Sequence, residues 1–383
     1  MTGPVVLDFL SDPMGGLLTS ARAFLNRVRR FDGKTQLLVL EFDGAVSSGV
    51  DERDAFDWVD IRRPGGLRGL RRLAWQNLVL PGILRRHGAK VYVSLSHYLP
   101  VTLPAGVGSI VGISNLAPFS TDALAAEVSL VKRLRLRVLR WTIVDAAQRA
   151  DRVIALSEAG RVELLGRWVS AEKIRKIPNG VVAPPQADVQ QDKVALSRLG
   201  VTGDFILCVS HFYRYKNFLR LVEAYSRLPA SLRARHPLLL VGAAYDPAYV
   251  EEVRQLADRL QLGAQVRIIP GVYDGDLSAL YRRCRLFAFP SLIENSPITL
   301  LEALAHGAVV AAADIPAMRE FGGDSAVYFD PRSSSAMAAT MANALCDEAL
   351  RATLAAKAPL QAAAHTWENF TSRLVATYRE LLV

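Results

Sequence analysis

Apolar residues in this chain occur in short unbroken runs, and stretches with helical periodicity separate these runs. Clear runs lie at residues 4–10, 35–42 and 204–210, and amphipathic stretches such as 218–228 and 247–262 lie between others. A strand that is buried on both faces of a sheet has no solvent-facing side, so its sequence does not alternate between apolar and polar residues. The pattern therefore predicts an α/β architecture built on parallel sheets, with helical regions that include residues 66–88, 121–150 and 333–358.

The alternation of strands and helices occurs twice along the chain. A polar segment with two consecutive prolines, residues 182–193, separates the two series and is typical of a linker. The length of 383 residues also exceeds what one ordinary core needs. We therefore expect two doubly wound, Rossmann-like domains, over residues 1–182 and 194–366. Ligands of such sheets bind at the carboxyl ends of the strands, so functional side chains should follow the strands directly.

Charge is divided unevenly between the two halves. Residues 1–183 contain 26 Lys and Arg against 17 Asp and Glu, whereas residues 184–383 contain 20 of each. The net charge of +9 thus belongs to the first half, which predicts an anionic partner there: a membrane surface, a phosphorylated substrate or nucleic acid. An arginine-rich composition without functional meaning is the competing interpretation.

The basic residues of the first half gather in two stretches. The second stretch, SLVKRLRLRVLRW, mixes cations with aliphatic residues and Trp141, as helices at membrane surfaces do. Docking on anionic lipid or on a polyprenyl diphosphate-linked glycan is one interpretation, and a solvated helix face is the other. Neither stretch has an RNA-binding motif or interleaved aromatic residues, so we do not expect nucleic acid as a partner. The two stretches comprise Arg62, Arg63, Arg68, Arg71, Arg72, Arg85 and Arg86, and Lys132, Arg133, Arg135, Arg137 and Arg140.

The sequence gives no sign of export. The first apolar run lacks a basic start and is interrupted by Asp8, unlike a signal peptide, and no 18 consecutive residues are apolar. Cys208, Cys284 and Cys346 lie far apart, which favours free thiols over a disulfide or a zinc site. We expect a cytoplasmic protein, located at the inner face of the cytoplasmic membrane if its basic helix docks there.

The main candidate site is residues 289–307, FPSLIENSPITLLEALAHG. The segment predicts a strand, a turn and a helix that begins near Pro297 with Ser296 as N-cap. Free backbone amides at such a helix start favour a phosphate group. Glu294 precedes the helix and Glu302 lies within it, where each carboxylate can accept hydrogen bonds from a pair of sugar hydroxyls. Alternatively, both are ordinary exposed acids.

A second segment, SHFYRYKNF at residues 210–218, follows the first strand of the same predicted domain. It places Arg214 and Lys216 at the same sheet edge, where cations can neutralise a diphosphate. The two segments together predict a site for a nucleotide-sugar. The DGD sequence at 274–276 has the spacing of a metal site but fits the start of a helix better, so we predict no metal site.

These segments, together with DIPAMREFGGDSAVYFDP at 314–331, resemble the nucleotide-sugar-binding domain of the retaining family 4 glycosyltransferases. Weaker similarity runs through residues 1–181, at PMGG, RADRVIALSE and IPNGV. The resemblance implies the GT-B fold, in which two Rossmann-like domains face each other across a cleft. It also implies that a final helix, residues 367–383, packs back on the first domain.

The resemblance implies roles for individual residues. Glu294 would hold the donor sugar, and Lys216 with Arg214 would stabilise the leaving diphosphate. The family's Gly-Arg-Leu turn is replaced here by Ser210-His211-Phe212, and its His-Asp pair by Ser114-Asn115. His97 and Asn115 are therefore the candidates on the acceptor side. The donor-binding residues implied are Gly15, Gly16, Ser210, Tyr273, Asn295, Ser296, Pro297 and Glu302.

The activity that the resemblance implies is a retaining, metal-independent transfer of a hexose, of mannose type. The donor would be a GDP- or UDP-linked sugar, and the acceptor a glycan or a polyprenyl-linked glycan in bacterial surface polysaccharide synthesis, such as lipopolysaccharide O-antigen, capsule or exopolysaccharide. No cofactor is implied besides the nucleotide-sugar. Two alternatives remain: a non-catalytic GT-B subunit that binds a sugar nucleotide, and a basic RNA-binding protein.

Overall fold

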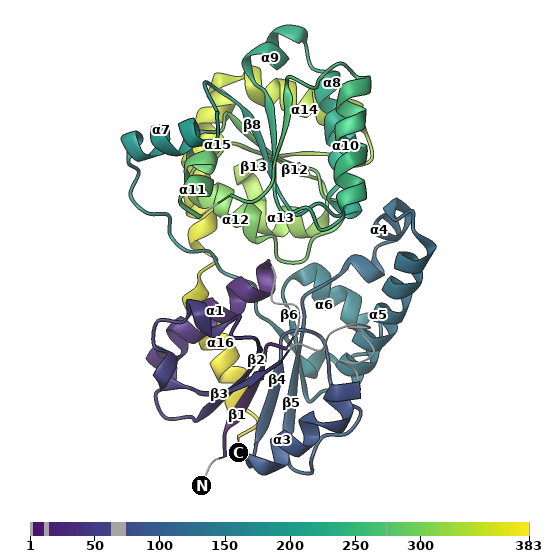
Figure 1. Ribbon diagram of the computed structural model, residues 1–383, viewed down its shortest axis with the longest axis vertical. Helices are drawn as coiled ribbons and strands as arrows, with labels where there is room; N and C mark the ends of the chain where they lie inside the picture. Colours follow the sequence, from purple (N-terminus) through teal and green to yellow (C-terminus); the bar gives the residue numbers. More distant parts are fainter. Residues whose placement is uncertain (1–2, 11–14, 63–73, 273, 383) are drawn as a thin grey trace. The chain divides into compact units, whose positions relative to one another are not determined.

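The computed structural model describes residues 3–10, 15–62, 74–272 and 274–382 (Figure 1). The chain divides into two compact units. The first unit contains the described residues up to 119, residues 135–180 and those from 367 onward, and the second contains residues 120–134 and 181–366. Each unit is a parallel sheet covered by helices, so the predicted fold class is confirmed.

Within the described residues, the sheet of the first unit has seven strands in the spatial order β3-β2-β1-β4-β5-β6-β7, and all neighbours run parallel. The chain adds strands on one side of β1 and then returns to add β4 on its other side. This reversal creates a switch point between β1 and β4. The strands are β1 (Val5–Asp8), β2 (Leu37–Phe42), β3 (Asp57–Ile61), β4 (Val91–Ser94), β5 (Gly108–Ile113), β6 (Arg152–Ala155) and β7 (Ile174–Lys176).

The last helix of the chain belongs to the first unit. α16 (Trp367–Arg379) packs on α1 (Gly16–Phe31), and Arg27 forms an ion pair of 2.8 Å with Glu368. Burial alone would raise the pKa of Asp32, but hydrogen bonds from Tyr378, Thr35 and Arg379 lower it to about 2. The other α-helices described in this unit are α3 (Leu80–Arg86), α5 (Leu130–Arg149), whose first residues cluster with the second unit, and α6 (Glu158–Leu165).

The sheet of the second unit repeats the same topology with six strands, counted over the residues that the structure describes. Their order is β10-β9-β8-β11-β12-β13, which places a switch point between β8 and β11. The strands are β8 (Ile206–Val209), β9 (Leu238–Val241), β10 (Val266–Ile269), β11 (Leu286–Phe289), β12 (Val310–Ala313) and β13 (Ala326–Phe329). The helices are α4 (Thr121–Ala126), α7 (Val189–Arg198), α8 (Phe218–Ser226), α9 (Ala230–Arg235), α10 (Pro247–Arg259), α11 (Asp274–Arg283), α12 (Ile298–Ala305), α13 (Pro316–Gly322), α14 (Ser334–Cys346) and α15 (Glu348–Ala363).

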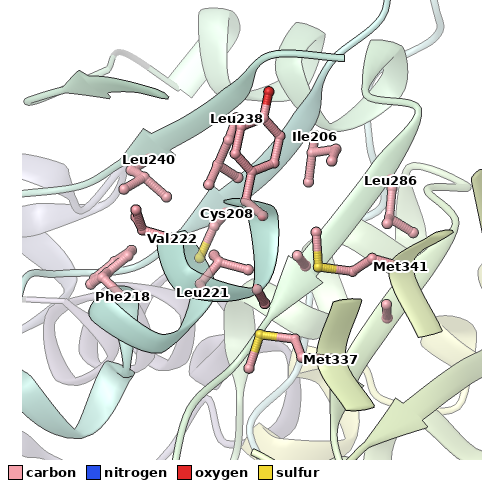
Figure 2. Packing of buried hydrophobic residues seen from close by; sticks show 14 of the residues in the cluster. Ile206, Cys208, Phe218, Leu221, Val222, Leu238, Leu240, Leu286, Met337 and Met341 are labelled. Carbon is pink, nitrogen blue, oxygen red and sulfur yellow. The ribbon is translucent and has the colours of Figure 1, made fainter. Parts of the chain in front are cut away.

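Both faces of this second sheet are buried, which explains the unbroken apolar runs in the sequence. Cys208 of β8 lies on one face with Leu221 of α8 and Met337 of α14, as Figure 2 shows. Leu207, the preceding residue, lies on the other face in a separate cluster that also includes Leu300 of α12. Successive strand residues point to opposite faces, so each must be apolar when helices cover both.

The structure departs from the sequence-based expectations at element boundaries. The predicted linker at 182–193 is helical from Val189, because the Asp188 side chain accepts hydrogen bonds from the amides of Gln190 and Gln191 and so caps α7. The predicted helix at 333–358 is divided at Asp347, whose side chain caps α15 in the same way.

Two further differences concern the first half of the chain. Residues 121–150, expected as one helical region, form the two helices α4 and α5. Residues 120–134 cluster with the second unit. Two ion pairs of 2.6 Å join them to it, one between Lys132 and Asp246 and one between Asp122 and Arg332. The edge strand β3 was not predicted, because its sequence DWVDI is half polar. Part of the predicted helix at 66–88 lies outside the described residues. Among the described helices, none is long and apolar enough to cross a lipid bilayer.

Candidate functional site

The candidate site lies at the switch point of the second sheet. β8 and β11 are neighbours, but the chain leaves them in opposite directions, toward β9 and toward β12. The loops that follow them, residues 210–217 and 290–297, therefore begin side by side at the carboxyl edge. Open α/β sheets bind ligands at such points. Each of the two segments that the sequence singled out, residues 210–218 and 289–307, contains one of these loops.

The two loops meet in an ion pair between Lys216 and Glu294. The Nζ of Lys216 lies 2.5 Å from Oε1 of Glu294, and the side chains are only 14% and 11% exposed. Burial by itself lowers the pKa of Lys216, but the Glu294 carboxylate outweighs it and the net shift is upward. Lys216 is therefore a permanent cation at neutral pH, in a partly desolvated position where charge interactions are strong.

Asn217 fixes the position of Lys216. Its backbone has the left-handed conformation, with φ 65° and ψ 32°, which turns the chain sharply into α8. Its buried side-chain amide donates to the carbonyl oxygens of Pro290, at 3.0 Å, and Pro331, at 2.8 Å. One side chain thus joins the loops that follow β8, β11 and β13. A further bond of 2.8 Å, from the amide of Leu292 to the carbonyl of Tyr215, holds the first two loops together.

The β8 loop also passes very close to Gly242, at the end of β9. A Cβ atom on Gly242 would lie 1.8 Å from the carbonyl oxygen of Ser210, and the backbone there has φ 155°. Real atoms cannot approach so closely, so this position requires glycine. Ser210, a predicted donor-binding residue, is buried, and its amide donates to the carbonyl of Val241 at 2.9 Å.

α12 begins one residue later than the sequence predicted. Pro297 is the N-cap and Ile298 the first helical residue, so Ser296 comes before the N-cap position. The reason is that the carbonyl of Pro297 accepts the first intrahelical bonds, from Leu300 at 3.1 Å and Leu301 at 3.2 Å. The backbone amides of residues 298 and 299 come before the first amide that donates to this carbonyl, that of Leu300. In the sequence they follow Glu294 by four and five residues.

The two acids of the segment have different partners. Whereas Glu294 contacts Lys216, Oε2 of Glu302 accepts a hydrogen bond of 3.0 Å from the hydroxyl of Tyr281 on α11. Burial, followed by the charge of Glu302, raises the pKa of Tyr281 well above its usual value, so this hydroxyl keeps its proton. Tyr281 was not predicted, since no pattern in the sequence relates a residue of α11 to one of α12.

Arg214 is not brought together with Lys216 and Glu294. Its guanidinium, 8% exposed, forms a bidentate ion pair with Glu252 of α10 and lies 5.0 Å above the ring of Tyr249. The hydrogen bond with Glu252 is the main cause that raises the pKa of Arg214. Arg214 and Lys216 belong to one 3-10 turn, where residues two apart point about 120° away from each other. The sequence placed both cations at the right edge but could not separate their directions.

Besides Nε of Arg214, two side-chain polar atoms of these loops have no hydrogen-bond partner among the described residues. They are Nδ1 of His211, in the β8 loop, and Oγ of Ser291, in the β11 loop, and both are shielded from solvent. Burial, followed by the nearby charge of Lys216, lowers the pKa of His211, so its ring is neutral at neutral pH. Buried polar groups are nearly always satisfied, so such atoms beside an ion pair indicate a place for a ligand. Neither residue was predicted as a contact.

The remaining predicted residues of the second unit have mixed outcomes. Asn295 is buried, Ser296 is partly buried, and Tyr273 lies outside the described residues. Asp276 of the DGD sequence forms an ion pair with Arg198. In the part of the chain that the structure describes, no group of three His, Cys, Asp or Glu side chains could hold a metal ion.

In the first unit, the glycine turn follows β1 at the switch point of its sheet. Gly15 has φ 63°, a conformation that favours glycine, and Gly16 begins α1. The buried Asp8 ends β1 and accepts hydrogen bonds from the amide of Leu10, at 2.7 Å, and from the hydroxyl of Tyr92. In the sequence Asp8 stands out only as an interruption of the first apolar run, whereas in the structure it organises the start of this turn.

The two acceptor-side candidates differ in how they are held. His97 has a positive φ of 59°, which is strained for a histidine, and its ring centroid lies 4.9 Å from that of Tyr98. The Asn115 side-chain oxygen accepts a hydrogen bond of 2.9 Å from the amide of Ala117, which stabilises its own turn. Strain of the kind seen at His97 concentrates at functional sites.

Two family models match the chain. The model described as "Glycosyl transferases group 1" matches residues 190–361, and "Glycosyltransferase Family 4" matches residues 14–183. Among curated proteins, the serotype-specific mannosyltransferase WbdA of Escherichia coli is 30% identical over 240 residues, which cover 61% of this chain and 29% of WbdA. The O-antigen chain mannosyltransferase B of Escherichia coli is 32% identical over 166 residues, 43% of each chain. This chain thus spans less than half the length of either relative.

A solved structure supports the fold. The Anabaena protein HepE, in complex with UDP and glucose, superposes with a TM-score of 0.76 over 99% of this chain and 100% of its own, at 19% sequence identity. At that identity the similarity concerns the architecture of the two sheets.

Proposed function

Because the chain belongs to the glycosyltransferases of group 1 and family 4 and has their GT-B fold, we propose that it transfers a hexose of mannose type from a nucleoside diphosphate-sugar to a glycan acceptor. The observation that carries this proposal is the Lys216–Glu294 ion pair at the switch point of the second sheet. The mannosyltransferase relatives support the choice of sugar. GDP- and UDP-linked donors both fit the proposal.

The ion pair is suited to exchange its partners when a donor binds. The donor brings a diphosphate, which is a better partner for the Lys216 ammonium than a single carboxylate. Glu294 is then released to accept hydrogen bonds from the hydroxyls of the sugar. The amides at positions 298 and 299 and the positive end of the α12 dipole add to the attraction for phosphate. In this proposal Glu302 binds the ribose, held in place by Tyr281.

The reaction that we propose breaks the bond between the anomeric carbon and the diphosphate oxygen. The acceptor hydroxyl forms the new bond to the same carbon, with retention, and its proton passes to an oxygen of the leaving diphosphate. Negative charge grows on the diphosphate as the sugar gains oxocarbenium character. Lys216 and the amides of α12 stabilise this charge electrostatically, so the proposal needs no metal. Arg214 holds the β8 loop through Glu252 and acts by positioning.

The acceptor that we propose is a glycan of bacterial surface polysaccharide, free or linked to a polyprenyl carrier. Support comes from the relatives, one of which is named for the O-antigen chain. His97 follows β4 at the carboxyl edge of the first sheet and is the residue that we assign to this side.

The test is a transfer assay with purified protein, mannose-containing acceptors and a panel of GDP- and UDP-sugars, with products detected by mass spectrometry. We expect turnover with one donor class and a loss of at least about a hundredfold in Glu294→Gln. The matched control is Glu251→Gln, an exposed acid on α10, which should keep full activity. Near-normal turnover of Glu294→Gln would overturn the proposal.

A non-catalytic subunit is the second candidate, and the absence of the family's His-Asp pair at Ser114-Asn115 favours it. Such a subunit would be protected against heating by a sugar nucleotide but would release no nucleoside diphosphate. An RNA-binding protein would instead retain bulk RNA at physiological salt without donor binding. The thermal-shift screen and the transfer assay together separate all three functions.

A further inference from the structure

Helix α5 has an exposed apolar stripe on the side opposite to its buried face. The buried residues Ile143, Ala146 and Ala147 lie in its C-terminal half. On a helix with about 3.6 residues per turn, the exposed apolar side chains fall within about 100° of arc, centred opposite to those three. A surface helix normally presents polar residues on that side. The α5 stripe consists of Leu130 (77% exposed), Val131 (78%), Leu134 (61%), Val138 (53%) and Trp141 (69%).

Cations border this stripe. Arg135 and Arg137 are both exposed, and helical geometry places them on the two sides of the stripe. Neither forms a hydrogen bond or an ion pair with another residue that the structure describes, whereas Lys132 is paired with Asp246 and Arg133 donates to the carbonyl of Glu127. Two arginine charges are thus uncommitted beside an apolar surface.

A second exposed tryptophan lies near the end of the stripe. Trp168 is 91% exposed and has φ 65°, a conformation that is unfavourable for any residue with a Cβ atom. Its turn is attached to α5, because the side-chain amide of Gln148 donates to the carbonyl of Arg167 at 2.9 Å. Gln148 lies two helical turns after Trp141 and therefore on the same side of the helix. Trp168 thus adds an exposed aromatic side chain near the C-terminal end of the stripe, from a turn that is separate from α5.

We propose that the α5 stripe and Trp168 dock on a lipid bilayer that contains anionic lipids. Arginine side chains bind headgroup phosphates, while tryptophan and aliphatic side chains enter the boundary between headgroups and acyl chains. A second copy of this chain fits the surface less well, because it would bring the same uncommitted arginines together. The net charge of +9, which belongs to the first half of the chain, attracts an anionic bilayer in addition.

The experiment is flotation of the 383-residue chain with vesicles of phosphatidylcholine, with or without phosphatidylglycerol. We expect binding to the anionic vesicles, weakened by salt, and little binding to the neutral ones. Arg135→Gln/Arg137→Gln should reduce the partition coefficient on the order of tenfold or more. Val138→Ser/Trp141→Ser should reduce it by about tenfold, and Trp168→Ser by less.

The matched control is Val189→Ser/Leu360→Ser, which removes two exposed apolar side chains of the second unit (59% and 75% exposed). This variant should bind vesicles like the unchanged protein. All substituted residues are exposed, so thermal midpoints should not change, and a melting curve for each variant checks this.

Equal binding to neutral vesicles, no binding to anionic ones, or binding that the stripe variants leave unchanged would each overturn the proposal. So would self-association that disappears in Val138→Ser/Trp141→Ser, measured by analytical ultracentrifugation, since the stripe would then be a protein interface. Docking does not depend on glycosyl transfer. Glu294→Gln should still float with anionic vesicles, so failure of one proposal is distinguishable from failure of the other.

Discussion

Lys216 and Glu294, 78 positions apart in the sequence, are in contact through Nζ and Oε1 at 2.5 Å. Their loops follow β8 and β11. These strands are neighbours because the chain adds β9 and β10 on one side of β8 and then returns to add β11 on the other side. The contact therefore depends on the sheet topology, and it places a largely buried cation and anion where we propose that a nucleotide-sugar binds.

Removal of one partner of this pair should destabilise the protein more than removal of both. Lys216→Met leaves the Glu294 carboxylate buried without a counterion, which should cost about 3 kcal/mol of unfolding free energy. The double variant Lys216→Met/Glu294→Leu should recover most of this loss, because neither charge is then left unpaired. Urea unfolding of the three proteins measures the difference. A double variant as unstable as the single one would contradict the assignment of the pair as a buried, mutually compensating ion pair.

Asn217 should matter through both its backbone and its side chain. In Asn217→Ala the carbonyl of Pro290 loses its side-chain donor, that of Pro331 keeps only the bond from Arg220, and alanine is strained at φ 65°. We expect a loss of about 3 kcal/mol, the sum of two weakened buried acceptors and the left-handed penalty. Asn217→Gly removes the same hydrogen bonds without the strain, so it should be less destabilised by about 1 kcal/mol. Chemical denaturation of both variants separates the two contributions.

Gly242→Ala should displace the β8 loop. The added methyl group would lie 1.8 Å from the Ser210 carbonyl oxygen. Because the clash is with the backbone, no side-chain rotation can relieve it, and the loop must move as a whole. We expect a loss of donor protection in thermal-shift measurements, together with a lower melting temperature of the unliganded protein. Gly275→Ala is the control, since a Cβ atom there meets nothing within 4 Å. Donor protection that survives in Gly242→Ala would show that the position of this loop is not needed for binding.

Stability should fall as the pH falls below about 6.5. Burial is the main cause that lowers the pKa of His211, His236 and His306, so the folded protein resists protonation that the unfolded chain accepts. The unfolded state then binds more protons, and each such proton costs at most about 1.4 kcal/mol per pH unit. This stability is fully present above the unfolded pKa and is lost below it.

Calorimetry from about pH 7.5 to about pH 5 measures this slope, because these pH values lie above the range in which most carboxylates titrate. His306→Gln should reduce the slope relative to the unchanged protein. Asp32 does not interfere, because its lowered pKa of about 2 confines its contribution to more acidic solutions. A melting temperature that is constant over this range would contradict the prediction.

The fold was predictable, and so was the sheet edge at which the two candidate segments lie, but the pairing of their residues was not. The Lys216 turn and the Glu294 segment were identified from residue types and from their place after strands. The direction of Arg214 toward Glu252, and the contact of Glu302 with Tyr281, were not identified. The orphaned atoms of His211 and Ser291 leave no mark in the sequence, because orphaning depends on what surrounds an atom.

The sequence by itself determined the elements and their class, because burial on one or both faces of a strand or helix is written in local periodicity. Two parallel sheets, the order of their helices and the sheet edge that bears the polar loops all follow from it. Only the tertiary structure decided which residues meet, where residues 120–134 belong, and that α5 exposes its apolar stripe. Those features depend on strand order and on packing between segments distant in the chain, and no local pattern encodes them.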